Sequence, residues 1–252
     1  MKKLTVLFSI LLFSVVVSAQ PYTIQQYLNI KSAGSPSFSP DAKQLIYLSD
    51  TTGTTQVWKV DLPAGKPVQL TNYEDNIGFA RWLPDGSGIV FGKARGGDEN
   101  TQFYWMKPDG SGVRSLTDEP SVRHNFGLIS DDGDVIAYAS NKRNRQFFDI
   151  YAMDIASGKE VLLFQHDGNN SVIALSDNGR QIIVSRDRIE KSLDNDLFLI
   201  DVRTKNEILL TPHTDASEFG DAEFLADSIL MTSNNGREFS ALTQLRQKNA
   251  SG

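Results

Sequence analysis

A unit of about 46 residues recurs along this chain, and this repeat constrains the fold more than any other feature. A turn of the Pro-Asp-Gly kind is centred at positions 41, 85, 132, 178 and 227, which are 44, 47, 46 and 49 residues apart. Two columns of large apolar residues keep the same register: Phe38, Trp82, Ile129, Leu175 and Phe224, and then Trp58, Tyr104, Tyr151 and Phe198. Repeats of roughly 40 to 50 residues are typical of solenoids and propellers.

Within each copy the pattern predicts four short strands. In the third copy, apolar runs at 126–130, 135–139, 147–154 and 161–164 are separated by residues typical of β-turns. The second run of a copy is apolar throughout, which is typical of a strand that is buried on both sides. The first runs carry small residues that suit crowding near a central channel: Ser37, Ala80, Gly127, Ala174 and Ala222. We therefore predict an all-β fold, a β-propeller of four-stranded blades.

The repeat also predicts the domain organisation. We expect a signal peptide at 1–19, an N-terminal lead segment at 20–34 and propeller blades over 35–252, with blade starts near residues 35, 80, 127, 172 and 221. Within the lead segment, 22–30 is expected to form a short helix capped by Thr23. About five blades are expected, the fifth truncated after three strands. The chain is then either a closed five-bladed ring with an irregular seam or, as we favour, the front of a longer propeller.

The first 19 residues have the organisation of a secretory signal peptide. Lys2 and Lys3 precede an apolar run of 14 residues, and small residues at 17–19 mark a cleavage site before Gln20. The run is shorter than the ~20 residues that a spanning helix needs, so an uncleaved membrane anchor is the alternative. We expect an exported protein, periplasmic or extracellular, without a membrane contact after cleavage.

Composition argues against several classes of partner and site. Cleavage would leave 23 Lys and Arg residues against 31 Asp and Glu residues, a net charge of −8, which argues against nucleic acid or anionic membrane as a partner. Without cysteine there is no disulfide and no thiolate metal site. No G-x-S-x-G, H-E-x-x-H, P-loop or EF-hand spacing occurs. We therefore expect no cofactor, no metal and no catalytic residue in this chain.

Long loops are expected on one face of the propeller, which we call the loop face. In a four-stranded meander, the loops between strands two and three emerge on the same face as the connections between blades, and function concentrates on such loops. The opposite face would carry only the short turns, whose Asp residues are expected to bond backbone amides. Candidate residues for contact with substrate or another domain are Arg95, Asp98, Glu99, Asn100, His124, Asn141 and Arg143. The alternative is that these loops are only solvated, and that Asp98 and Glu99 cap neighbouring amides.

Four segments resemble a known family. The strings at 34–41, 95–102, 138–144 and 148–151 are similar to the propeller domain of prolyl oligopeptidase family serine peptidases, closest to the acylaminoacyl-peptidase and dipeptidyl-aminopeptidase branch. The likeness covers about residues 22 to 246. It implies a propeller of about seven or eight blades that caps a C-terminal α/β-hydrolase domain and admits peptides to a Ser-Asp-His triad.

The resemblance implies as partners a peptide substrate and the missing α/β-hydrolase domain. None of the family's catalytic residues can be carried over, and the adjacent glutamates by which some dipeptidyl peptidases hold a substrate amino terminus are absent. We interpret the chain as the secreted N-terminal propeller of a serine exo- or oligopeptidase, truncated before the hydrolase domain and inactive alone.

Two other classes stay open at this stage. A periplasmic interaction module of the Tol-system kind would normally carry a small α/β domain before its blades, where this chain has only residues 20–34. A propeller lactonase or glycosidase would need converging carboxylates at the channel mouth. Its candidates would be Glu74, Asp98, Glu99 and Asp118.

Overall fold

A computed structural model describes residues 22–188, 190–226 and 228–246 of the protein. It divides into two compact units, residues 1–31 and 32–252, which are described separately below. The predicted signal peptide, its cleavage site and the fifth turn centre at position 227 lie outside the described residues.

The first unit contains one short helix, α1 (Ile24–Leu28). Thr23 Oγ1 accepts a hydrogen bond from the Gln26 amide at 3.2 Å, and Gln26 Oε1 accepts one from the Thr23 amide at 2.8 Å. This reciprocal capping box satisfies two amides that the first turn leaves unpaired. The predicted helix and its cap are confirmed. In the described part of the chain, no helix has the length and apolarity that crossing a membrane requires.

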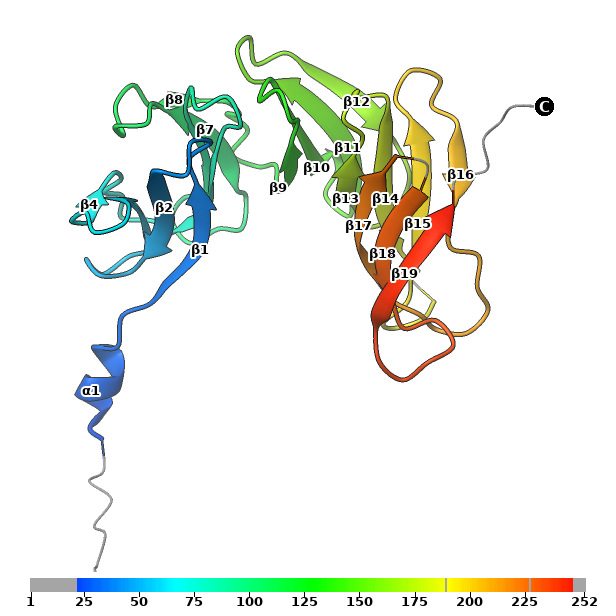
Figure 1. Ribbon diagram of the computed structural model, residues 1–252, viewed down its shortest axis with the longest axis horizontal. Helices are drawn as coiled ribbons and strands as arrows, with labels where there is room; N and C mark the ends of the chain where they lie inside the picture. Colours follow the sequence, from blue (N-terminus) through cyan, green and yellow to red (C-terminus); the bar gives the residue numbers. More distant parts are fainter. Residues whose placement is uncertain (1–21, 189, 227, 247–252) are drawn as a thin grey trace, which may run out of the picture. The chain divides into compact units, whose positions relative to one another are not determined.

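The second unit consists of antiparallel sheets made of consecutive strands, which we call blades 1 to 5 (Figure 1). Blade 1 contains β1 (Ala33–Phe38), β2 (Gln44–Ser49), β3 (Gln56–Asp61) and β4 (Val68–Gln69). Blade 2 contains β5 (Ile77–Trp82), β6 (Ile89–Lys93), β7 (Gln102–Met106) and β8 (Arg114–Ser115). Blade 3 contains β9 (His124–Ile129), β10 (Val135–Asn144), β11 (Phe147–Asp154) and β12 (Glu160–Phe164).

Blade 4 contains β13 (Asn170–Leu175), β14 (Gln181–Asp187), β15 (Asn195–Asp201) and β16 (Glu207–Leu209). The described part of blade 5 contains β17 (Phe219–Leu225), β18 (Ser228–Ser233) and β19 (Ala241–Arg246). The first strands begin two or three residues before the expected blade starts, at 33, 77, 124, 170 and 219. The all-β, propeller-like fold is confirmed.

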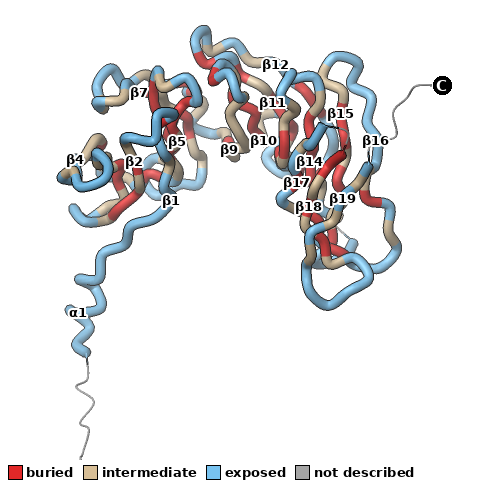
Figure 2. The backbone as a smooth tube through the Cα atoms, in the orientation of Figure 1, coloured by how far each residue is buried: buried red, intermediate tan, exposed pale blue. Residues whose placement is uncertain are grey.

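The core lies between successive blades. Four apolar clusters among the described residues each combine side chains from two neighbouring blades. The second strands supply the most buried residues, such as Val90 in β6 and Ile183 in β14, because each is covered on both faces (Figure 2). The predicted burial of these strands on both sides is confirmed for blades 2, 3 and 4.

The repeated turn is held by its own side chains, as predicted. The residue at the turn centre accepts a hydrogen bond from the backbone amide two residues on, in the pairs Asp41 and Lys43, Asp85 and Ser87, Asp132 and Asp134, and Asn178 and Arg180. In three blades a serine hydroxyl donates to the same side chain, from Ser39, Ser130 and Ser176. These residues therefore have a structural role, because they close the turn locally.

The first strand of every blade carries a β-bulge near its small residue. In β9 the extra residue is Gly127, where a Cβ atom would lie 2.7 Å from both the Ala137 carbonyl oxygen and Val172 Cβ. The first strands of neighbouring blades lie side by side here, since β9 contacts β13 and β13 contacts β17. The predicted crowding is confirmed at Gly127.

One predicted loop is wrong. Asn141 and Arg143 are predicted to lie in a loop, but β10 continues through Asn144 and pairs with β11 as a hairpin in which Asn144 lies opposite Phe147. The extension is stabilised from the neighbouring connection, because the Asn141 amide donates to the Arg123 carbonyl oxygen at 3.2 Å. Asn141 and Arg143 therefore belong to a strand.

Candidate functional site

The loop 94–101 joins β6 to β7 on the loop face. Gly96 and Gly97 take the left-handed conformation, with φ of 61° and 79°, which glycine adopts without steric cost. The Gly96 amide donates to Asp75 Oδ1 at 2.8 Å, and Asp98 Oδ1 accepts from the amides of Arg95 (3.3 Å) and Asn100 (3.0 Å). Asp98 thus shapes the loop by capping its backbone, which was the structural alternative for this residue.

The same loop is bonded to the connection between blades 2 and 3. Asn100 Nδ2 donates to the Pro120 carbonyl oxygen at 2.9 Å. Gln102 Nε2 donates to the carbonyl oxygens of Glu119 and Val122, and its Oε1 accepts from the Glu119 amide at 2.9 Å. The structure therefore brings 95–100 and 118–125 together, as predicted from the strand order.

Two charged candidates remain at the surface of this loop. The Glu99 side chain is 82% exposed and pairs with Arg123, whose Nη1 lies 2.8 Å from Glu99 Oε2. Arg95 is exposed, and within the described residues its guanidinium forms no hydrogen bond or ion pair. An exposed pair such as Glu99 and Arg123 contributes roughly 0–1 kcal/mol to stability. Both side chains can therefore meet another molecule without disrupting the fold.

Arg143, in contrast, is held by carboxylates. Its Nε and Nη2 lie 2.6 and 2.9 Å from the two oxygens of Asp149, and its Nη1 lies 2.8 Å from Asp167 Oδ1. These hydrogen bonds, to Asp149 first, raise the pKa of Arg143 above its ordinary value. Asp149 is buried and also accepts from the His166 amide. The arrangement ties the β10–β11 hairpin to the connection between blades 3 and 4.

His124 is the first residue of β9 and is buried, whereas a surface loop position was expected. Its ring packs against the rings of Phe103 and Tyr138, with centroids 5.6 Å away in both cases. Neither ring nitrogen has a hydrogen-bond partner, and Nε2 lies 3.5 Å from Glu119 Oε2. Burial, and then the charge of Lys142, lowers the pKa of His124 to about 4. The imidazole is therefore neutral at neutral pH. Contact of His124 with substrate or another domain stays a prediction.

A charged cluster lies beside His124 and joins blades 2 and 3. Lys142 Nζ lies 2.8 Å from Glu119 and also bonds Glu160, which accepts from the Tyr138 hydroxyl at 2.7 Å. Burial alone would lower the pKa of Lys142, but its hydrogen bonds to the two glutamates outweigh burial and raise it. The lysine thus stays charged and neutralises part of the acidic charge between the blades.

Blade 4 holds a second cluster, which no sequence motif predicts. Arg188 lies 2.8 and 2.9 Å from the two oxygens of Asp196, in the same way as Arg143 pairs with Asp149. His213 Nε2 lies 2.7 Å from Asp194 Oδ1. A signal for this cluster was present, because Asp149 and Asp196 occupy a polar column two residues before the aromatic one. Its members are Gln56, Gln102, Asp149 and Asp196.

The alternative of a propeller lactonase or glycosidase gains no support from the described residues. Residues 22–188, 190–226 and 228–246 contain no group of three or more histidine and carboxylate side chains placed to hold a metal ion. Of the carboxylates that a propeller lactonase or glycosidase would use, Asp98 caps loop amides and Glu99 pairs with Arg123. Neither observation supports a carboxylate pair for acid–base catalysis.

Comparison with known proteins places the chain in a family. The family described as PD40, the TolB beta propeller domain, matches residues 17–219. The chain belongs to this family. Its relatives include peptidases as well as TolB proteins, so the predicted relationship to prolyl oligopeptidase family propellers is confirmed.

Three relatives match parts of the chain. It is 31% identical to the uncharacterized peptidase YuxL of Bacillus subtilis over 36% of its length, and 28% identical to dipeptidyl aminopeptidase BIII of Pseudoxanthomonas mexicana over 51%. It is 26% identical to the Tol-Pal system protein TolB of Francisella tularensis over 33%. These matches span only 15%, 19% and 19% of the relatives' own lengths.

Solved structures show the same fold at low identity. A putative TolB from Agrobacterium tumefaciens has a TM-score of 0.62 at 19% identity, covering 88% of this chain and 79% of its own. An oligogalacturonate lyase in complex with manganese has a TM-score of 0.69 at 14% identity, covering 86% and 65%. An acylaminoacyl peptidase in complex with a chloromethyl ketone has a TM-score of 0.61 at 17% identity, covering 85% and 38%. At these identities the likeness concerns the fold alone.

Proposed function

We propose that this chain is the exported propeller part of a serine peptidase of the prolyl oligopeptidase family, which acts on peptides together with an α/β-hydrolase domain outside these 252 residues. The observation that carries the proposal is the match to dipeptidyl aminopeptidase BIII over 136 residues, against 83 residues for the TolB proteins. In this role the propeller restricts entry to a catalytic site that it does not itself contain.

The loop face is the surface we assign to contact with the hydrolase domain or with passing peptide. Arg95 and Glu99 stand at the surface of a loop whose backbone is held by Asp75, Asp98 and the 118–122 connection. A rigid loop that presents opposite charges can orient a charged peptide end or a partner side chain at little entropic cost. The loop face is also stabilised by the hydrogen bonds described above for Asn100, Asn141 and Arg143.

A second candidate is an interaction module of the TolB kind. It is favoured by the family description and by the Agrobacterium tumefaciens TolB structure, of which the chain covers 79%. Under this alternative the loop face would bind another protein and no peptidase activity would accompany it.

The test uses the native gene product purified from its source and assayed with chromogenic aminoacyl and dipeptidyl substrates. We expect Glu99→Gln and Arg95→Ala to lower kcat/KM about tenfold, equivalent to about 1.4 kcal/mol, at an unchanged melting temperature. Asp177→Asn is the matched control, because Asp177 is an exposed carboxylate in a short turn at the other end of the strands. Absence of peptidase activity in the native product would favour the TolB-type module.

A further inference from the structure

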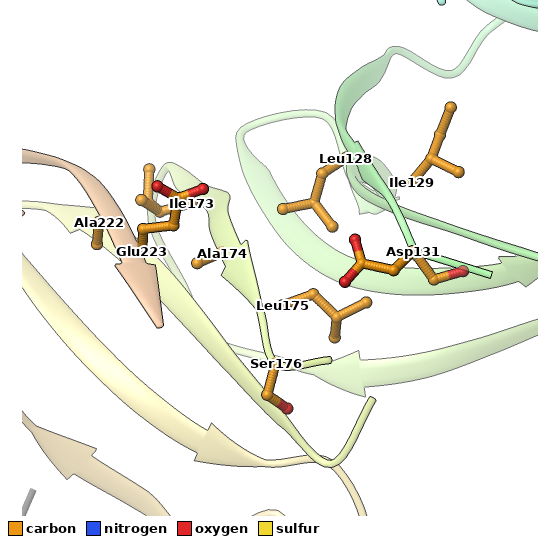
Figure 3. Close-up of a pocket in the computed structure, with 10 residues that line it drawn as sticks. Leu128, Ile129, Asp131, Ile173, Ala174, Leu175, Ser176, Ala222 and Glu223 are labelled. Carbon is orange, nitrogen blue, oxygen red and sulfur yellow. The ribbon is translucent and has the colours of Figure 1, made fainter. Parts of the chain in front are cut away.

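The first strands of blades 3, 4 and 5 enclose a crevice of about 170 Å³ (Figure 3). Six of its ten lining residues are apolar, among them Leu128, Ile173, Ala174 and Leu175, while polar atoms make up the larger part of its exposed lining. The crevice lies toward the ends of these strands where the short turns begin, since Ser130 and Ser176 also line it. The loop face lies at the opposite ends of the same strands, so the crevice is distinct from the site proposed above.

The crevice follows from the bulges in the inner strands. In β13 the extra residue of the bulge is Ile173, which is left out of the pairing register with β14. A bulge changes the direction in which the side chains of a strand point, and bulges are frequent next to active sites and at the rims of barrels. The neighbouring positions, Ala174 and Ala222, are small and buried, so no side chain fills the space between the strands.

Two carboxylates border the apolar residues of the crevice. Figure 3 shows the Asp131 carboxylate beside Leu128 and Leu175, and the Glu223 carboxylate beside Ile173. Both residues are exposed, and within the described residues neither side chain has a hydrogen-bond or ion-pair partner. This sets Asp131 apart from its neighbour Asp132, whose carboxylate accepts from Ser130 Oγ and the Asp134 amide. No lysine or arginine lines the crevice.

We infer that the crevice binds an extended peptide segment in which a lysine or arginine stands next to an apolar side chain. The apolar side chain would enter the crevice, and the basic side chain would lay its aliphatic stem on Leu128 or Leu175 and bring its charge to Asp131 or Glu223. The net charge of the chain, −6, attracts such a segment and repels an acidic one.

The size of the crevice favours a side chain over a small-molecule ligand. The volume of the crevice is about 170 Å³. Pockets for drug-sized ligands are larger, roughly 300–1,000 Å³. A segment that inserts one side chain and rests another on the rim fits this volume.

The test measures binding to the 252-residue chain by fluorescence anisotropy, with two labelled peptides that differ only in a central Leu-Lys-Leu or Leu-Glu-Leu. We expect the lysine peptide to bind at least about tenfold more tightly, and its affinity to fall as salt rises. The double variant Asp131→Asn, Glu223→Gln should remove this preference. Asp215→Asn, an exposed carboxylate remote from the crevice, should leave it unchanged.

Equal binding of both peptides, or unchanged binding by the double variant, would overturn the inference. Spermine provides charge without an apolar side chain, so competition by spermine at the concentration of the lysine peptide would also contradict it. The binding needs no catalysis, and the result is therefore independent of whether the chain serves a peptidase.

Discussion

Arg143 and Asp149 form a two-pronged ion pair, with nitrogen-to-oxygen distances of 2.6 and 2.9 Å. The side chain of Asp149 is 1% exposed and that of Arg143 is 30% exposed, so the pair runs from the interior to the surface of the loop face. The planar guanidinium matches the carboxylate in a way that a lysine ammonium cannot. The pair therefore acts as a structural clamp on the β10–β11 hairpin.

Arg143→Ala should destabilise the fold by about 2–3 kcal/mol, because it leaves the buried Asp149 carboxylate without its charged partner. The matched variant Arg123→Ala removes an arginine whose partner, Glu99, is exposed, and it should cost less than about 1 kcal/mol. Urea unfolding of both variants measures the difference. Equal stability of the two variants would show that Arg143 does not clamp the hairpin, and its role as a contact residue would then gain weight.

His124 should make the protein less stable in mild acid. Its pKa in the folded state is about 4, below the ordinary 6.5, so the unfolded chain takes up a proton that the folded chain refuses as pH falls between these values. The free energy of unfolding should fall by about 3 kcal/mol between pH 6.5 and pH 4. His124→Phe should flatten the dependence of unfolding free energy on pH between 6.5 and 4. His166→Gln, which changes an exposed histidine, serves as the control.

The turn carboxylates should produce a separate loss of stability at lower pH. Hydrogen bonds from Ser39 and Ser130, and then from backbone amides, lower the pKa values of Asp41 and Asp132 below 3.8. A lowered folded-state pKa stabilises the fold above the ordinary value and loses this contribution as pH falls below it. The double variant Asp41→Asn, Asp132→Asn should lack this contribution at pH 7 and should therefore lose less stability between about pH 5 and 3.

Asn178 supports this expectation, because its side-chain oxygen makes the same two hydrogen bonds in blade 4 without a titrating group. Urea unfolding at pH 7 and at pH 3.5 measures the stability of each variant and its loss on acidification. A double variant that is as acid-sensitive as the unchanged chain would refute a contribution from these turns.

Gly127→Ala should destabilise the protein by about 1–3 kcal/mol, because the added Cβ would meet backbone and side-chain atoms at 2.7 Å. Gly220 lies in the first strand of blade 5, where a Cβ would meet only Thr232 Oγ1 at 3.6 Å, an ordinary contact. Gly220→Ala should therefore change stability by less than about 0.5 kcal/mol. Similar denaturation midpoints for the two variants would mean that blades 3 and 4 can separate to admit a side chain.

The repeat predicted the strands, the turn capping by Asp41 and Asp132, and the small residues of the inner strands, since each depends on local spacing. The β10 extension was missed because Asn141 is held by the Arg123 carbonyl oxygen, which comes from another part of the chain. The burial of His124 was missed for the same kind of reason. Its environment is formed by Phe103 and Tyr138, and loop composition carries no information about those contacts.

The column of Gln102, Asp149 and their equivalents was within reach of the sequence, because its period equals that of the aromatic residues two positions later. The role of this column could not be predicted from the sequence. The same position bonds backbone carbonyl oxygens through Gln102 and an arginine through Asp149. Only the positions of the connecting loops distinguish these two uses.

The most direct test of the central claim is fluorophosphonate labelling of the native gene product, followed by mass spectrometry of the labelled peptide. A propeller that serves a serine peptidase predicts one labelled serine in a G-x-S-x-G sequence outside residues 1–252, and no labelled serine within them. A native product that is never labelled, or one labelled within residues 1–252, would contradict this account.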